Sequence, residues 1–497
     1  MNLTQVKKVG IIGSGVAGLT TAKLLLSQGL DCMIFERNSV LGGVWAAGYS
    51  NFGVQVQKEL YEFPDWPLSA DVPNFTPGPV IQNYLEDYAK HFDIWPNIRF
   101  NTTVTGVKER TSPSQGGWVV TAESAGKQGT NEFDLLVICT GLFSNIPYMP
   151  QFAGEETFNG RIIHISEFTT RDIVKNKKVV VVGFGKSASD AALEASKVAS
   201  KTTIVFREPH WPVPPNLLGI LPFKWAMLNR LTSSLIPPYV QPSNVERVVH
   251  SLGKPLVWFW WRLVELLLIA QCRLWSRFGT RPSLIPQKPV EIDTFGESTM
   301  LPRPNFYSLM RNGSIEPHQG QISEYQSNSI LLNTGEKIEA DVVILATGWK
   351  SDFSFLPESV MSRLNFEDDG FYLYRHILNP QVPNLAFIGI MSTISNMLTY
   401  NLQALWLCEL IKGTHQLPSG DEMQESIEQL KAWKRSWMPF SRARSSRLLL
   451  HMLHYHDELL KDIGISPLRK TGIFAPFKEA FAPYQPSDYK SIVSGKA

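Results

Sequence analysis

Two regions of the chain share one pattern of apolar and polar positions, in which short apolar runs alternate with longer amphipathic stretches. In the first region, residues 8–13 and 32–35 predict buried strands, and residues 16–27 between them predict a helix. In the second region, residues 179–182 and 203–206 are again apolar runs separated by a helical pattern. Strands that alternate with helices predict parallel βαβ units. The pattern therefore predicts an α/β fold with two Rossmann-like dinucleotide-binding domains.

A glycine-rich turn joins the first strand to its helix and reads Gly-Ser-Gly-Val-Ala-Gly over residues 13–18. Its first glycine allows the tight turn, its second lets the backbone approach a diphosphate, and its third packs the helix against the strand. The helix N-terminus offers free N–H groups to the phosphates. The next strand ends on Glu36, whose carboxylate suits the hydroxyls of an unmodified ribose. We therefore expect FAD here, with these contacts: Gly13, Ser14, Gly15, Gly18, Glu36 and Arg37.

The second turn reads Gly-Phe-Gly-Lys-Ser-Ala over residues 183–188, with alanine in place of the third glycine. Alanine still allows fairly close packing of the helix. The next strand ends on Arg207, and a guanidinium at this place binds a 2′-phosphate. Glu208 follows directly and weakens this preference, because a carboxylate suits an unmodified ribose. The pattern favours NADPH over NADH, with these contacts: Gly183, Gly185, Lys186, Ser187, Ala188 and Arg207.

Two further segments, residues 135–141 and 341–348, each read as a buried strand that ends in a glycine turn. Each resembles a crossing of the chain between dinucleotide domains, and Thr140, Thr347 and Gly348 are expected beside the cofactors. The NADPH domain is thus expected to interrupt a discontinuous FAD domain. The expected division is an FAD domain over 1–173 and 341–440, an NADPH domain over 174–340 with an apolar helical insertion over 211–289, and a C-terminal helical extension over 441–497.

Composition narrows the class of protein. The chain has 497 residues, of which 43% are hydrophobic, enough for two or more cores. Its net charge of +2 is too small to indicate a nucleic acid or an anionic membrane as the partner. The four cysteines are far apart and form no C-x-x-C pair, which indicates a reducing compartment, and no secretory signal is visible. We therefore expect a large cytoplasmic enzyme, with membrane association left open.

A metal site has one weak candidate, the histidines His451, His454 and His456. At helical spacing His451 and His454 share a face, but no cluster of carboxylates or cysteines accompanies them. An exposed helix is the favoured interpretation, and no metal is expected.

The least ordinary stretch is the apolar run over residues 255–270, inside the insertion. Arg262 and Glu265 interrupt it, and it is shorter than the ~20 apolar residues that a membrane span needs. Three interpretations stay open: a buried helix beside the active site, an interfacial helix on a membrane, and a contact in a homo-oligomer. A buried helix is the default, although the tryptophans favour the two interfaces slightly. In each case we expect the segment to shape access for an apolar substrate.

A longer motif points to a family. Residues 158–168 match the pattern F-x-G-x-x-x-H-x-x-x-[FY], with His164 inside it and Phe168 at its end. This pattern identifies flavin-containing monooxygenases, whereas the related Baeyer–Villiger enzymes usually carry Trp at the last position. The likeness continues in residues 41–45, 58–67, 346–349, 385–389 and 412–419. The chain therefore resembles the flavin-containing monooxygenases, which are class B flavoprotein monooxygenases. The resemblance adds these flavin contacts: Gly43, Val44, Trp45 and Lys58.

The resemblance implies chemistry that uses FAD, NADPH and O2. NADPH reduces FAD, O2 adds to form a C4a-hydroperoxyflavin, and a nucleophilic nitrogen or sulfur of a small molecule takes the distal oxygen. The candidate catalytic residues are His164, expected to position the NADP rather than to transfer a proton, and Gln55. Gln55 stands where the family commonly has an Asn that hydrogen-bonds the flavin intermediate and the nicotinamide cofactor. Its amide sits on a longer stem, so either the role survives with shifted geometry or the intermediate leaks peroxide.

Two alternatives to nitrogen or sulfur oxygenation stay open. One is Baeyer–Villiger oxidation of a ketone, against which Phe168 argues weakly. The other is a nonoxygenating flavoprotein, acting as an NADPH oxidase or a redox-responsive binding protein, and Gln55 keeps this alternative alive.

Overall fold

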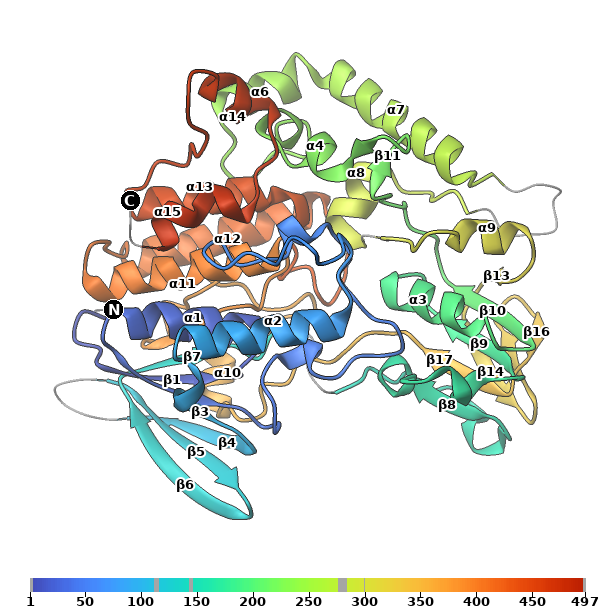
Figure 1. The fold of residues 1–497 in the computed structure, drawn as a ribbon, viewed down its shortest axis with the longest axis horizontal. Helices are drawn as coiled ribbons and strands as arrows, with labels where there is room; N and C mark the ends of the chain where they lie inside the picture. The colour runs from blue at the N-terminus through green and yellow to red at the C-terminus, as the bar shows by residue number, and fades with distance from the viewer. Residues whose placement is uncertain (1–2, 111–115, 143–145, 276–283, 299, 495–497) are drawn as a thin grey trace.

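Two parallel five-stranded sheets form the two halves of the molecule (Figure 1). The computed structural model describes residues 3–110, 116–142, 146–275, 284–298 and 300–494. Helices cover the sheets, and a helical layer lies along the edge that Figure 1 shows at the top. The α/β class that the apolar pattern predicts is confirmed.

The first sheet has the strand order β18-β7-β1-β2-β3, and each neighbouring pair is parallel. Its strands are β1 (Lys8–Ile12), β2 (Asp31–Phe35), β3 (Ile98–Arg99), β7 (Leu135–Ile138) and β18 (Leu385–Phe387). All four residues of β7 are buried, because the strand has a neighbour on each side and layers on both faces. Since β18 follows the second sheet along the chain, this domain is discontinuous in sequence.

Helices and a small antiparallel sheet complete the first domain. Helix α1 (Val16–Ser27) contacts α11 (Asn396–Lys412), and α2 (Gly78–His91) lies beside α1 (Figure 1). Helix α11 is buried almost all round, which explains why its apolar residues occupy every face. The antiparallel strands are β4 (Thr102–Glu109), β5 (Trp118–Ser124) and β6 (Lys127–Phe133).

The second sheet has the order β13-β10-β9-β17-β8 and is also parallel throughout. Its strands are β8 (Arg161–His164), β9 (Lys178–Val182), β10 (Lys201–Phe206), β13 (Glu316–Gln319) and β17 (Val342–Leu345). Helix α3 (Lys186–Ala195) follows β9 and packs on this sheet. A three-stranded antiparallel sheet adjoins it, made of β14 (Ile322–Gln326), β15 (Ser329–Leu332) and β16 (Lys337–Glu339).

The second sheet includes strands from outside the range 174–340 that the pattern assigned to the NADPH domain. The expected division ended the first domain at residue 173 and resumed it at residue 341, but β8 and β17 both pair within the second sheet. The strand β17 lies between β8 and β9 and hydrogen-bonds to both. The expected boundaries at 173/174 and 340/341 are therefore wrong for this sheet, because strand pairing joins segments that are far apart along the chain.

The insertion is made of short elements and one long helix. They are β11 (Asn216–Leu217), β12 (Leu221–Pro222), α4 (Phe223–Met227), α5 (Arg230–Ser233), α6 (Asn244–Ser251), α7 (Lys254–Cys272), α8 (Val290–Ile292) and, beyond it, α9 (Phe306–Arg311). Residues 276–283 of the expected insertion lie outside the described residues. Among the residues described, α7 is the single helix long and apolar enough to cross a bilayer by length and composition.

Helix α7 lies at the surface, so the default interpretation of a buried helix is wrong. Three of its residues are buried: Trp261, Val264 and Leu268. The opposite face carries Leu256 and Leu266, which are 75% and 63% exposed. Both faces of α7 are apolar, so the pattern alone does not reveal which face meets the protein.

The C-terminal region is a stack of helices on the first domain (Figure 1). The stacked helices are α12 (Gly420–Trp437), α13 (Met452–Asp462) and α15 (Lys490–Val493), whereas α14 (Ala475–Phe481) lies beside α6. Helix α10 (Glu358–Leu364) lies apart from them and shares an apolar cluster with β7. The expectation of an exposed helix around His451 and His456 is wrong, because both side chains are buried. His456 shares a hydrogen bond with Thr399 of α11 at 2.8 Å. No group of histidine, cysteine or carboxylate side chains in the described part of the chain is arranged to hold a metal.

Candidate cofactor sites and active site

The first glycine turn is packed too closely for a side chain at Gly13 or Gly18. Gly13 has a φ of +101°, and a Cβ there would lie 2.7 Å from the carbonyl oxygen of Cys139. A Cβ on Gly18 would collide with the carbonyl oxygen of Gly13. Gly15 caps α1 in an extended conformation. Glycine is therefore required for backbone conformation at one position and for close packing at another.

Glu36 lies at the C-terminal end of β2 and organises the turn. Its carboxylate accepts hydrogen bonds from the Ser14 amide at 3.0 Å and from the Ser14 hydroxyl at 2.7 Å. The other carboxylate oxygen accepts from the amide and side chain of Asn38. Arg37 is exposed beside it. The carboxyl group expected to hold a ribose is thus buried at the mouth of the expected diphosphate site.

The turn at Gly42 and Gly43 packs against the first glycine turn. Gly42 and Gly43 both have positive φ, and the Gly42 amide donates to the Ser14 carbonyl at 3.0 Å. A Cβ on Gly15 would lie only 3.7 Å from the Gly43 Cα, so both turns approach as bare backbone. The 3₁₀ turn Gly43–Trp45 continues the chain, with Val44 exposed. Thr140, two residues after β7, is half-buried, and its Cα would lie 3.6 Å from a Cβ on Gly13.

Trp45 connects this turn to the segment over residues 58–67. Its indole N–H donates to the Tyr61 hydroxyl at 3.1 Å, and the two rings meet edge to face. Lys58 was expected to contact the flavin, but its side chain binds backbone carbonyl groups of the protein. Its ammonium donates to three carbonyl oxygens, of Ser69, Ala70 and Val72, at 2.8–3.0 Å. All three N–H donors of Lys58 are therefore engaged in holding a loop.

Gln55 lies between the two buried residues Val54 and Val56 and is itself exposed. The backbone bends at Gln55 and Val56, and this bend leaves the Gln55 side chain at the surface. Its carboxamide is therefore free to turn toward a group bound above the segment. This geometry suits the amide role that the motif suggests, and that role stays a prediction.

The second glycine turn leaves open space at the start of α3. Gly183 has a φ of +128°, and a Cβ there would lie 2.9 Å from the Ala346 carbonyl oxygen. Gly185 caps α3, and a Cβ on it would have no atom within 4 Å. Ala188 is fully buried, so alanine fits where the third glycine usually stands. The N-terminus of α3, including the half-buried Ser187, can therefore receive a diphosphate.

Arg207 is exposed directly after β10, with its backbone carbonyl accepting from Gln319. Glu208, the residue that complicated the choice of nucleotide, is paired with Lys288 at 2.8 Å. The hydrogen bond from Lys288 lowers the pKa of Glu208, so the carboxylate stays charged, and the Lys288 ammonium offsets its negative charge. The local surface at the strand end therefore carries the net positive charge that a 2′-phosphate requires.

Lys186 was expected to contact NADPH, but its side chain binds groups of the protein instead. Its ammonium donates to the Gly53 carbonyl at 2.8 Å and to the Tyr49 hydroxyl at 3.1 Å, and it pairs with Asp190 at 3.0 Å. Its backbone N–H remains in the first turn of α3. The side chain thus reaches across to the first domain, while the main chain stays at the nucleotide end of the helix.

His164 ties β8 to the segment after β17. Its Nε2 lies 3.1 Å from the Gly348 carbonyl and its Nδ1 lies 2.9 Å from the Ser166 hydroxyl. Because a carbonyl only accepts, Nε2 carries the proton and Nδ1 accepts from Ser166. Burial lowers the pKa of His164, so the imidazole is neutral. With both nitrogens engaged, His164 is better suited to position Gly348 and Trp349, whose ring it meets edge to face, than to carry protons.

Thr347 completes this crossing. Its hydroxyl donates to the Tyr148 carbonyl at 2.5 Å, and the Tyr148 amide donates back to the Gly348 carbonyl. Gly348 itself has a φ of +88°. Residues 347 and 348 are thus hydrogen-bonded to Tyr148, which follows the crossing over residues 135–141 along the chain.

Three residues that contact Lys186 or its neighbours were not predicted from the sequence: Tyr49, Asp190 and Arg303. Asp190 had a usable signal, since a charged residue four positions after Lys186 shares its helix face. Tyr49 and Arg303 had none, because they come from distant loops.

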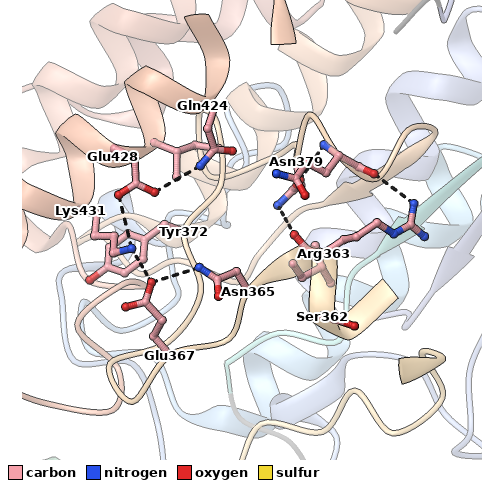
Figure 2. Close-up of a pocket in the computed structure, with 12 residues that line it drawn as sticks. Ser362, Arg363, Asn365, Glu367, Tyr372, Asn379, Gln424, Glu428 and Lys431 are labelled. Carbon is pink, nitrogen blue, oxygen red and sulfur yellow. Dashed lines mark hydrogen bonds and ion pairs between the residues drawn. The ribbon is translucent and has the colours of Figure 1, made fainter. Parts of the chain in front are cut away.

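A polar cavity of about 220 Å³ lies between α10 and α12, away from both glycine turns (Figure 2). Its side chains bond to one another, as Lys431 does with Glu367 and Gln424 with Glu428. None of its lining residues belongs to the expected cofactor contacts. This cavity is therefore not the candidate active site.

Comparison with known proteins decides the family. The model of the family "Flavin-binding monooxygenase-like" matches residues 6–243 and 308–496. The chain belongs to this family. Its sequence is 31% identical to flavin-containing monooxygenase 1 of Homo sapiens, over 99% of this chain and 90% of the relative.

Solved structures agree on the fold. S-allyl-L-cysteine S-oxygenase from Allium sativum matches with a TM-score of 0.64 and 19% identity, over 98% of this chain and 92% of that one. Cyclohexanone monooxygenase from Rhodococcus sp. Phi1, bound to NADP⁺, matches with a TM-score of 0.67 and 16% identity, over 92% and 97%. As in this family of flavoprotein monooxygenases, the cofactors are FAD and NADP, as the two strand ends predict.

Proposed function

We propose that this flavoprotein monooxygenase uses NADPH and O2 to oxygenate a nucleophilic nitrogen or sulfur atom of a small molecule. The observation that carries the proposal is the complete F-x-G-x-x-x-H-x-x-x-F segment, with Phe168 fully buried at its end. The S-oxygenase of similar fold and the family of the human relative support this choice of substrate class.

The residues of the chain bind and orient in this proposal. Glu36 and the first glycine turn hold FAD, while Gly185, the start of α3 and Arg207 hold NADPH. His164 keeps Gly348 in place, and the exposed Gln55 carboxamide would hydrogen-bond a group formed on the bound flavin. When bound, FAD and NADPH together supply the reduction of O2 and the transfer of one oxygen atom. The amine substrate reacts as its neutral form, because a protonated nitrogen has no lone pair to offer.

An isotope experiment tests this function. The purified holoenzyme is supplied with NADPH, ¹⁸O2 and either a tertiary amine, a thioether or a cyclic ketone. The expected result is an N-oxide or sulfoxide that carries one ¹⁸O atom per NADPH consumed. A labelled lactone from the ketone alone would replace the proposal with Baeyer–Villiger oxidation. Hydrogen peroxide with no labelled product, for every substrate, would instead favour the oxidase alternative, which the exposed Gln55 keeps in view.

We further propose that the protein, from the cytoplasmic side, binds an anionic membrane surface through one apolar edge. The apolar edge is defined as the exposed apolar side chains of the β11–β12 turn, of α6 and α7, and of the segment around α14. Figure 1 shows α6, α7 and α14 along one edge of the molecule. The members are Leu218, Ile220, Leu221, Val245, Val248, Leu252, Leu256, Phe259, Leu263, Leu266, Ile473, Phe474 and Phe477. Apolar surface gathered in this way marks an interaction site.

The charges of this edge favour lipid over a second subunit. Residues 211–275 contain six Lys or Arg residues and two Glu residues. Both glutamates are engaged with neighbours, Glu246 with His454 and Glu265 with Arg262. Three of the six cations, Arg247, Lys254 and Arg273, are exposed, whereas the other three are paired with Glu59, Asp457 and Glu291. Exposed cations beside apolar side chains suit anionic headgroups, at about 1 kcal/mol per Lys or Arg. Because the exposed apolar stripe runs along α7, the helix is expected to lie in the membrane plane.

Sedimentation with vesicles tests the apolar edge. We expect the protein to sediment with phosphatidylcholine vesicles that contain phosphatidylserine and to bind vesicles without it more weakly. The double variant L256E/F259E removes two apolar side chains, each contributing about 1.5–3 kcal/mol when buried, so binding should fall at least tenfold. F440E, an exposed position outside the edge, serves as the control. No vesicle binding, together with a dimer that the double variant dissociates, would assign the edge to a homo-oligomer instead.

A further inference from the structure

Helix α3 carries a row of charged residues that faces away from solvent. Lys186, Asp190 and Glu194 are four residues apart, so they lie on one face of the helix. Their side chains are 11%, 2% and 1% exposed. Charged side chains are rarely buried unless they are paired. The partners of this row therefore explain what α3 is fixed against.

The first two members of the row bind a loop of the first domain. The Lys186 ammonium donates to the Gly53 carbonyl oxygen at 2.8 Å. The Tyr49 hydroxyl lies between Lys186 and Asp190, accepting from the first at 3.1 Å and donating to the second at 2.9 Å. A Cβ on Gly53 would lie 2.7 Å from the Thr76 carbonyl oxygen, so this loop also has no room to move toward its other neighbour.

The rest of the row extends the same contact. Arg303 donates to Asp190 at 3.0 Å and to the Asn51 carbonyl oxygen at 3.0 Å. The Asn51 side chain donates to Glu194 at 3.0 Å, and Glu194 also accepts from Arg171. Residues 49, 51 and 53 are thus each bound by α3 or by a partner of α3.

The bound loop leads directly to the candidate catalytic amide. Gln55 follows Gly53 after a single residue, and a chain of two residues spans at most about 7 Å. The Ser50 amide also donates to the carbonyl of Phe168, the last residue of the family motif. Residues 49–53 therefore fix the chain on the N-terminal side of Gln55, next to the Val54 amide, which donates to the Thr76 carbonyl at 2.9 Å.

Lys186 is one of the residues through which α3 contacts the first domain. It is the first residue of α3, where the main chain is expected to receive the diphosphate, and its side chain holds Gly53. Burial lowers the pKa of Lys186, although Asp190 opposes the shift, so its ammonium depends on these partners. Movement of the first turn of α3 therefore changes the contacts of residues 49–53 directly.

We propose that Lys186, together with Tyr49 and Asp190, is a positioning residue that links binding of NADP at α3 to the placement of Gln55. The inference rests on the proposed function only for the role of Gln55 at the flavin. The link itself is a contact between two segments and can be observed without turnover.

Hydrogen–deuterium exchange of the FAD-loaded enzyme tests the link. In the wild-type protein, saturating NADP⁺ is expected to slow exchange in peptides that cover residues 49–57 at least fivefold. Lys186→Met keeps the length and apolar stem but removes the ammonium, so this protection should fall below twofold while the Kd for NADP⁺ changes less than threefold. Lys201→Met is the matched control, because Lys201 begins β10, which α3 contacts, and its ion pair with Glu316 is exposed on both sides.

A second variant guards against misfolding of the first. Tyr49→Phe removes one hydroxyl and keeps the ring, and it should reduce the NADP⁺-dependent protection while leaving Lys186 bound to Gly53. Full protection in both variants, or no protection in the wild type, would overturn the link. A tenfold loss of NADP⁺ affinity in Lys186→Met with protection retained at saturation would make Lys186 a nucleotide ligand instead. If the link holds but no substrate is oxygenated, the proposed function fails alone.

Discussion

Neutralising Asp190 is the sharpest test of how the two dinucleotide domains hold together. Asp190 is 2% exposed and accepts hydrogen bonds from Tyr49 at 2.9 Å, Lys186 at 3.0 Å and Arg303 at 3.0 Å. Asp190→Asn keeps the shape and removes the negative charge. Two cations then face each other in a poorly hydrated contact, with an amide where their counter-ion stood.

The magnitude follows from the burial of the partners. Breaking a buried ion pair by removing one partner costs about 3–5 kcal/mol. Lys186 keeps the Gly53 carbonyl and Arg303 is one-quarter exposed, so we take the lower end, about 3 kcal/mol. A loss of this size changes the unfolding equilibrium about 10²-fold.

Equilibrium unfolding in urea, followed by tryptophan fluorescence with FAD in excess, measures this loss. Glu339→Gln is the control, because the Glu339–Lys178 pair is exposed on both sides and should leave the midpoint unchanged. Adding Lys186→Met to Asp190→Asn should recover part of the stability, since one unpaired cation is removed. A loss below about 1 kcal/mol in Asp190→Asn would show that water screens these charges, and the burial argument would fail.

Four further results follow from individual positions. Gln55→Ala should keep FAD bound but raise the peroxide released per NADPH, measured with a peroxidase assay, and unchanged coupling would remove Gln55 from the chemistry. Arg207→Ala should raise the KM for NADPH about 10- to 100-fold, from the loss of charged hydrogen bonds of about 1.5–3 kcal/mol, with the KM for NADH as the reference; equal effects on both would contradict the 2′-phosphate assignment. Gly18→Ala should yield protein without the flavin absorbance band, since its Cβ would collide with Gly13. Burial lowers the pKa of His456 to about 3, so on acidification the unfolded chain binds a proton at this side chain before the folded protein does. The free energy of unfolding should therefore fall as pH drops from about 6.5 toward 3, by up to about 1.4 kcal/mol per pH unit from this group. His456→Gln should reduce this pH dependence in urea titrations, and an unchanged pH dependence would refute the argument.

Local features of the two nucleotide sites were predictable from short stretches of sequence. The conformations of Gly13 and Gly183 follow from turns in which neighbouring residues settle the geometry. Glu36 and Arg207 end strands that the apolar runs define, so their place at the sheet edge follows directly. Fold class, cofactors and family could therefore be predicted from the chain alone.

The side chains of the two lysines show where such prediction ends. Lys58 and Lys186 lie in motifs that point to cofactors, yet their ammonium groups bind the carbonyl of Gly53 or of the loop at Ser69. A long flexible side chain reaches about 6 Å from its Cα, and its nearest acceptors come from segments remote in sequence.

Only the tertiary structure shows which remote segments pair or pack with one another. Strand β17 pairs with β8 and β9 although more than 150 residues separate it from each, so the domain boundary had no local signal. Helix α7 is apolar on both faces, and only packing of Trp261 and Leu268 reveals which face is inside. Periodicity and turn chemistry are encoded in contiguous residues, and these the sequence determines by itself. Burial and pairing depend on which surfaces the rest of the chain brings near, and these only the folded structure decides.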